Sequence, residues 1–69
     1  MVNVKRTNLS RIRKESKLTQ SQLAEISGVN VRMIQHYEQR QKPINSAEAL
    51  TVYKLAQALN CKIEALLEL

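Results

Sequence analysis

The fold of this chain is predicted from residues 20–38, which read QSQLAEISGVNVRMIQHYE. The small side chain of Ala24 lets two helix axes approach closely. Gly28 can adopt the positive φ that ends a helix and turns the chain sharply. Apolar side chains are spaced so that each helix buries one side, and they are Leu23, Ala24, Val29, Ile34 and Tyr37. The stretch therefore predicts two short helices joined by a tight turn.

The second of these helices is expected at residues 31–39, with a polar outer face. A steep helix pair with a tight turn is a helix-turn-helix, whose second helix can lie in the major groove of DNA. Ile34 and Tyr37 would point inward, which leaves the polar positions free to meet base edges. The pattern predicts a DNA-binding protein.

The composition favours one all-helical domain, residues 1–69. One Gly, one Pro and no Trp or Phe are too few turn residues and aromatics for many short strands. No apolar run approaches the roughly 18 residues of a membrane span, and no secretory signal is recognisable. A single cysteine, Cys61, cannot form an internal disulfide and agrees with a reducing compartment. We therefore expect a cytoplasmic protein with no membrane partner.

The positive charge is concentrated in the first part of the chain. Residues 1–42 carry nine Lys and Arg against three Glu, whereas residues 43–69 carry two Lys against three Glu. The net charge of +5 is therefore the sum of +6 and −1. The basic part coincides with the helix-turn-helix pattern at about residues 20–39, where a polyanion would bind.

Five helices are expected after a basic, flexible arm at residues 1–6, and their approximate ranges are 8–17, 20–28, 31–39, 46–59 and 63–68. The predicted N-terminal caps are Thr7 or Asn8, Thr19 with Gln22, Asn30, and Asn45 with Glu48. Asn60 suits the C-terminal cap of the fourth helix. The largest apolar stripe is expected on that helix, from Leu50, Val52, Leu55, Ala56 and Leu59. These elements predict a compact five-helix bundle.

With these elements in place, the chain resembles the helix-turn-helix domain of phage repressors and Cro proteins, also called the xenobiotic-response-element type. The resemblance covers about residues 8–67, and Ala24, Gly28 and Ile34 occupy the three most restrictive positions of the motif. It implies a five-helix domain that binds operator-like DNA, usually as a homodimer on an inverted repeat. Arg40 stands where the family usually has Gly, so a strained backbone or a longer helix is expected near it. Ser27 stands where many members have an apolar residue.

The outer face of the second motif helix supplies the candidate base-reading residues, which are Val31, Arg32, Gln35 and His36. Arg32 can bond the O6 and N7 atoms of guanine, and Gln35 can bond the N6 and N7 atoms of adenine. The alternative is that these residues form only the solvated face of an amphipathic helix. His36 is not expected to bind a metal, because the chain has no second His and Cys61 is distant in sequence.

Phosphate contacts are expected from helix N-termini and from the basic loop after residue 39. The candidates are Gln20, Asn30, Arg40, Lys42, Asn45 and Ser46. The resemblance implies that Gln20 touches a phosphate and also braces the DNA-reading helix. It further implies a partly buried structural ion pair between Arg13 and Glu38. Lys5 and Arg6 could reach DNA as an arm or remain solvated.

The C-terminal end offers more apolar surface than one short helix can bury, and we expect a homodimer to form there. The candidate interface residues are Ile63, Leu66, Leu67 and Leu69, with core packing as the alternative. The predicted function is a sequence-specific regulator of transcription on double-stranded DNA, most simply a repressor. The alternative is a protein-interaction module, such as an antitoxin partner. One His, one Cys and no phosphate-binding Gly loop leave no catalytic, metal or cofactor site to build.

Overall fold

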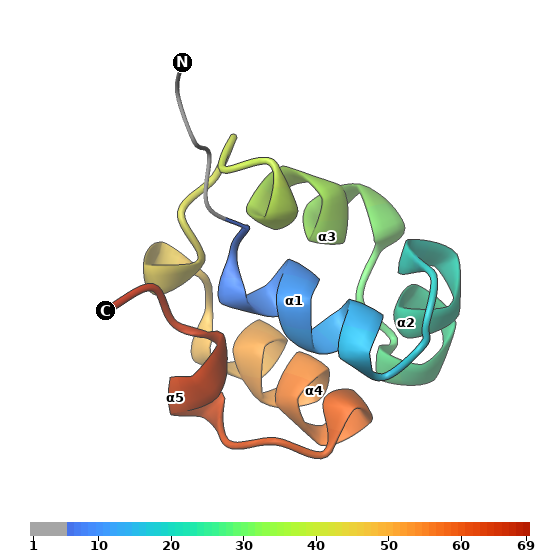
Figure 1. Ribbon diagram of the computed structural model, residues 1–69. Helices are drawn as coiled ribbons and strands as arrows, with labels where there is room; N and C mark the ends of the chain where they lie inside the picture. Colours follow the sequence, from blue (N-terminus) through green and yellow to red (C-terminus); the bar gives the residue numbers. More distant parts are fainter. Residues whose placement is uncertain (1–5) are drawn as a thin grey trace.

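The computed structural model describes residues 6–69 and contains five α-helices with a short 3-10 helix, η1 (Figure 1). The elements are α1 (Asn8–Glu15), α2 (Gln20–Ser27), α3 (Val31–Glu38), η1 (Ile44–Ser46), α4 (Ala49–Leu59) and α5 (Ile63–Leu66). Within this part of the chain there are no strands, so the all-α prediction is confirmed. The predicted arm lies outside the described residues, except for Arg6, which is exposed.

The first three helices begin at the predicted caps. The hydroxyl of Thr7 accepts a hydrogen bond from the backbone N–H of Ser10, and Thr19 and Gln22 form a complete capping box. Asn30 caps α3 by accepting from the backbone N–H of Arg32 at 2.7 Å. Each cap satisfies N–H groups that a helix start leaves without an intrahelical partner, which is why these residue types set the helix starts.

Left-handed residues follow four of the helices, α1 to α4. Gly28, with φ of 77°, follows α2, and Asn60, with φ of 55°, follows α4, both as predicted. The end predicted for α1 near Lys17 is wrong, because the helix stops at Glu15. Lys17 has φ of 60°, a conformation that cannot continue a right-handed helix.

The predicted start of the fourth helix is also wrong. Residues 44–46 form η1, and α4 begins at Ala49 with Glu48 as an N-cap that makes no side-chain hydrogen bond. The predicted cap, Asn45, instead bonds the backbone of Glu68. The helix α5 ends at Leu66 rather than Glu68, because the chain is already extended at Leu67.

The helices enclose one core. Here α2 packs against α3 and α4, while α1 packs against α3 and α5. Figure 1 shows α1 between α3 on one side and α4 with α5 on the other. The largest fully buried side chains are Leu9, Leu23, Ile34, Leu55 and Leu66.

One predicted member of the α4 stripe lies outside this core. Leu50 is 61% exposed, whereas Val52, Leu55, Ala56 and Leu59 are buried. At about 100° per residue, Leu50 lies on the side of the helix opposite Val52. The buried stripe therefore begins at Val52, in the first turn of the helix.

Candidate nucleic-acid interface

The helix α3 is held by its buried face and offers its other face to solvent. Ile34 and Tyr37 are buried in the core, as predicted. Of the four candidate base-reading residues, Arg32 is exposed and Val31, Gln35 and His36 are partly exposed. The Nδ1 atom of His36 is shielded from solvent and has no hydrogen-bond partner in the described part of the chain. A contact from His36 to DNA would therefore use Nε2.

A two-point ion pair joins α1 to the last residue of α3. The Nε atom of Arg13 lies 2.6 Å from Oε2 of Glu38, and its Nη2 donates to Oε1 of Glu38 at 3.0 Å. The side chains are only 9% and 6% exposed. The Nη1 atom of Arg13 also donates to the carbonyl of Leu18 at 2.8 Å, so the guanidinium is bonded at all three nitrogens. This pair fixes the end of α3 against α1.

Gln20, the first residue of α2, extends this network to the outer face of α3. Its Nε2 donates to Oε1 of Glu38 at 2.9 Å, and its Oε1 accepts from Nε2 of Gln35 at 3.5 Å. A carboxylate only accepts, so Glu38 fixes which way the Gln20 amide faces. One N–H and the Oε1 atom of Gln35 take no part in this network. That remaining pair matches the N7 acceptor and N6 donor of adenine.

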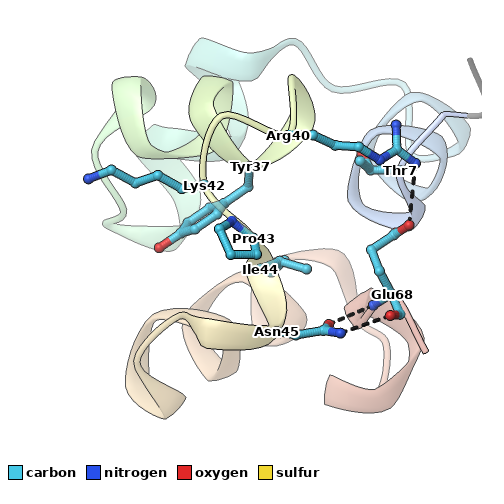
Figure 2. Close-up of a pocket in the computed structure, with 8 residues that line it drawn as sticks. All are labelled: Thr7, Tyr37, Arg40, Lys42, Pro43, Ile44, Asn45 and Glu68. Carbon is cyan, nitrogen blue, oxygen red and sulfur yellow. Dashed lines mark hydrogen bonds and ion pairs between the residues drawn. The ribbon is translucent and has the colours of Figure 1, made fainter.

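The loop after α3 sends its two cations in opposite directions. Figure 2 shows Lys42 on one side and Arg40 directed toward Thr7 and Glu68 on the other. The Nη2 atom of Arg40 lies 3.4 Å from Oε1 of Glu68. The backbone φ of Arg40 is 59°, which is the strained conformation expected near this residue.

The remaining predicted phosphate contacts lie at helix starts or near one. Asn30 uses its side-chain oxygen to cap α3. Asn45 and Ser46 are exposed but lie in η1, so the placement of these two residues at the start of the fourth helix is wrong. The side chain of Asn45 is already bonded to Glu68, a contact between distant residues that the local sequence pattern did not signal.

This geometry agrees with a family comparison. Residues 9–66 match the helix-turn-helix family, which also includes repressor and Cro-type domains. The chain belongs to this family. The match spans most of the chain, from α1 to α5. It is a DNA-binding domain of the class that regulates transcription. Curated proteins gave no match to the chain.

The C-terminal end of the helix-turn-helix domain is only partly exposed. Leu66 has no exposed surface and belongs to the core, so its predicted place in a dimer interface is wrong. It is buried because α5 packs against α1 and α4. Leu67 is half-buried, Ile63 is 36% exposed, and Leu69 is 97% exposed. The apolar surface at this end is therefore formed by Ile63, Leu67 and Leu69.

Burial changes the titration of two groups in the helix-turn-helix domain. Desolvation, followed by the nearby carboxylate of Glu48, raises the pKa of Tyr37 above its ordinary value of 10.0. Burial likewise raises the pKa of the Cys61 thiol above 9.0. Both groups are therefore neutral near pH 7, which suits side chains that pack against the core.

Residues 6–69 lack two other kinds of feature. Within that range, no three His, Cys, Asp or Glu side chains gather closely enough to hold a metal ion. None of the helices there has the length and apolar character needed to cross a membrane.

Proposed function

We propose that this domain is a sequence-specific regulator of transcription that reads the major groove of double-stranded DNA with α3. The observation that carries the proposal is the hydrogen-bonded chain that holds the Gln35 side chain. The bonds from Gln35 to Gln20 and from Gln20 to Glu38 limit how the Gln35 amide can rotate. A base-reading side chain that is oriented before binding loses less conformational freedom when it binds.

Arg32 is the second proposed base reader. Its side chain is exposed in the first turn of α3, which is the part of a recognition helix that reaches base edges. A bidentate contact from Arg32 would select guanine, as the remaining edge of Gln35 would select adenine. Val31 and His36 would contribute a methyl contact and a single hydrogen bond.

Phosphate contacts would fix the position of the domain on the duplex without reading sequence. Gln20 begins α2 and Asn30 caps α3, so both lie where backbone N–H groups favour an anion. Lys42 is exposed in the loop after α3. Arg40, Asn45 and Ser46 complete the proposed set, with Arg40 having to share its guanidinium between a phosphate and Glu68.

The proposed assembly is a homodimer that pairs through Ile63, Leu67 and Leu69. The proposed location is the cytoplasm, and the proposed function needs no cofactor and no enzymatic activity. Two-fold symmetry would place two α3 helices in successive major grooves, about 34 Å apart. A repressor is the simplest regulator of this kind, because a bound dimer can block a promoter. The exposure of Ile63 and Leu69 also supports the alternative that this end binds a different protein, such as a toxin.

The test is selection of binding sites by the purified protein from a randomised duplex pool at near-physiological salt. Enrichment of an inverted repeat with half-site centres about 10 base pairs apart would support the dimeric regulator. Recovery of no preferred sequence, with retention that depends only on salt, would contradict sequence-specific reading. Co-purification of a different protein in equal amount would favour the alternative partner at the C-terminal end.

A further inference from the structure

Glu68 lies where three segments of the chain meet. Its backbone N–H donates to Oδ1 of Asn45 at 2.8 Å, and its carbonyl accepts from Nδ2 of Asn45 at 2.8 Å. Its carboxylate accepts from the backbone N–H of Asn8 at 2.6 Å and pairs with Arg40 at 3.4 Å. Figure 2 shows the contacts with Asn45 and Arg40. One residue thus binds the start of α1, the loop after α3, and η1.

These contacts hold both ends of the loop between Arg40 and Asn45 against Glu68. Both end residues bond Glu68, and the loop between them carries Lys42 on the outside. Two backbone N–H groups, of Gln41 and Lys42, also bond the carbonyl of His36. The loop is therefore joined to α3 and, through Glu68, to the opposite end of the chain.

Arg40 combines an unusual backbone conformation with the side-chain contact to Glu68. A residue with a side chain rarely adopts a φ of 59°, and glycine would adopt it without strain. Glycine, however, could not reach Glu68. The side chain at this strained position is thus the one that connects the loop to the carboxylate.

We propose that Glu68 is a positioning residue for DNA binding, which it serves by holding the loop so that Lys42 faces a backbone phosphate. This inference rests on the proposed function. Phosphate contacts carry no sequence information. Loss of the Glu68 carboxylate would therefore change the affinity for all DNA sequences and the salt dependence of that affinity, and would leave the base preference unchanged.

The test compares Glu68→Gln with Glu64→Gln, which removes the same charge from an exposed position on α5. Removal of a negative charge near DNA would by itself raise affinity, and we expect that small rise for Glu64→Gln. For Glu68→Gln we expect affinity to fall about threefold at 200 mM salt, with a salt slope smaller by up to about 0.9 per protomer. Adding Lys42→Ala to Glu68→Gln should then lower the slope little further, because the two changes remove the same contact.

Asn45→Ala is a second variant that opens the other end of the loop without a change in charge. It should lower the salt slope as Glu68→Gln does, which loss of the neutral Asn45 amide as a phosphate contact would not do. A rise in affinity for Glu68→Gln that equals or exceeds the rise for Glu64→Gln would overturn the proposal, because Glu68 would then only repel DNA. A lower thermal midpoint with an unchanged salt slope would also overturn it, since Glu68 would then serve stability alone.

A measurement without DNA separates this inference from the proposed function. Backbone NMR order parameters for residues 40–44 should drop from the rigid value of about 0.85 toward 0.6 in Glu68→Gln, but not in Glu64→Gln. Equal rigidity in both variants would overturn the positioning role even if the protein bound no specific sequence. If the unaltered protein showed no sequence-specific binding while the loop loosened as expected in Glu68→Gln, the proposed function would be contradicted instead.

Discussion

Arg13 and Glu38 make a nearly buried, two-point ion pair between α1 and the last residue of α3, with contacts of 2.6 and 3.0 Å. Oε1 of Glu38 also accepts from Gln20, so the same carboxylate serves stability and the proposed reading of DNA. Removal of either partner leaves the other charge without its counterion in a site that water hardly reaches. The cost of such a charge is much larger than the net worth of the pair.

We expect Arg13→Ala and Glu38→Ala each to lower the free energy of unfolding by about 3–5 kcal/mol. The double variant should cost less than the sum of the two, because no unpaired charge remains. Urea denaturation of the two single variants and the double variant measures this. The control is Arg11→Ala, whose partner Glu15 is exposed and whose loss should cost less than about 1 kcal/mol. Equal losses for Arg11→Ala and Arg13→Ala would mean that water screens the buried pair.

The left-handed conformation of Lys17 predicts a stabilising substitution. Lys17 is exposed, has φ of 60°, and follows the C-cap of α1. Lys17→Gly should raise the free energy of unfolding by about 0.5–1 kcal/mol, because relief of the strain exceeds the added entropy of the unfolded chain. Lys14→Gly, which makes the same change inside α1, should lower it by about 1 kcal/mol. Thermal unfolding of both proteins would show shifts of opposite sign, and shifts of the same sign would contradict the role assigned to Lys17.

The local sequence was sufficient to predict most of the helix starts. Thr19, Gln22 and Gly28 act on neighbours within a few residues, so their pattern is visible in sequence. Asn45 has the same capping chemistry, but Glu68, a residue far along the chain, binds its side chain first. Leu66 looked available for a partner, and only the packing of α5 against α1 and α4 shows that it is buried.

In the candidate site, too, some features are visible in the local sequence and others depend on residues far along the chain. The outward positions of α3 follow from helical spacing once Ile34 and Tyr37 are placed inside. The resemblance to repressors supplied the pairing of Arg13 with Glu38, which composition and spacing do not reveal. Arg40 pairs with Glu68, a residue far along the chain, and this contact could not be predicted from the loop alone.

Tyr37 should make the stability of the domain fall at high pH. Burial and the carboxylate of Glu48 raise the pKa of Tyr37 in the folded state above 10.0. Its contribution is fully present below the pKa of the unfolded chain, near 10.0, and is lost as the pH rises through the folded pKa. Tyr37→Phe should therefore flatten the decline in stability above pH 10, measured by urea denaturation between pH 8 and about 11.

The control for this experiment is Tyr53→Phe, because Tyr53 is 48% exposed. Both variants should be made with Cys61→Ala, since burial also raises the pKa of that thiol and would add a decline of the same sign. A decline that is equally steep with Phe at position 37 would show that Tyr37 titrates alike in the folded and unfolded chain.

The proposed division of labour between base reading and phosphate contact predicts two kinds of loss. Arg32→Ala should remove about 1–3 kcal/mol of discrimination at one base pair in each half-site, because guanine loses its bidentate partner. Lys42→Ala should weaken binding to all sequences alike and reduce the salt slope by about 1 per protomer. Binding measured on the selected site and on its single-base variants, at several salt concentrations, separates the two effects. Lys54→Ala is the matched control, since Lys54 is exposed on α4 rather than on the proposed DNA surface. If Arg32→Ala and Lys42→Ala weakened every sequence equally, α3 would not be the helix that reads the bases.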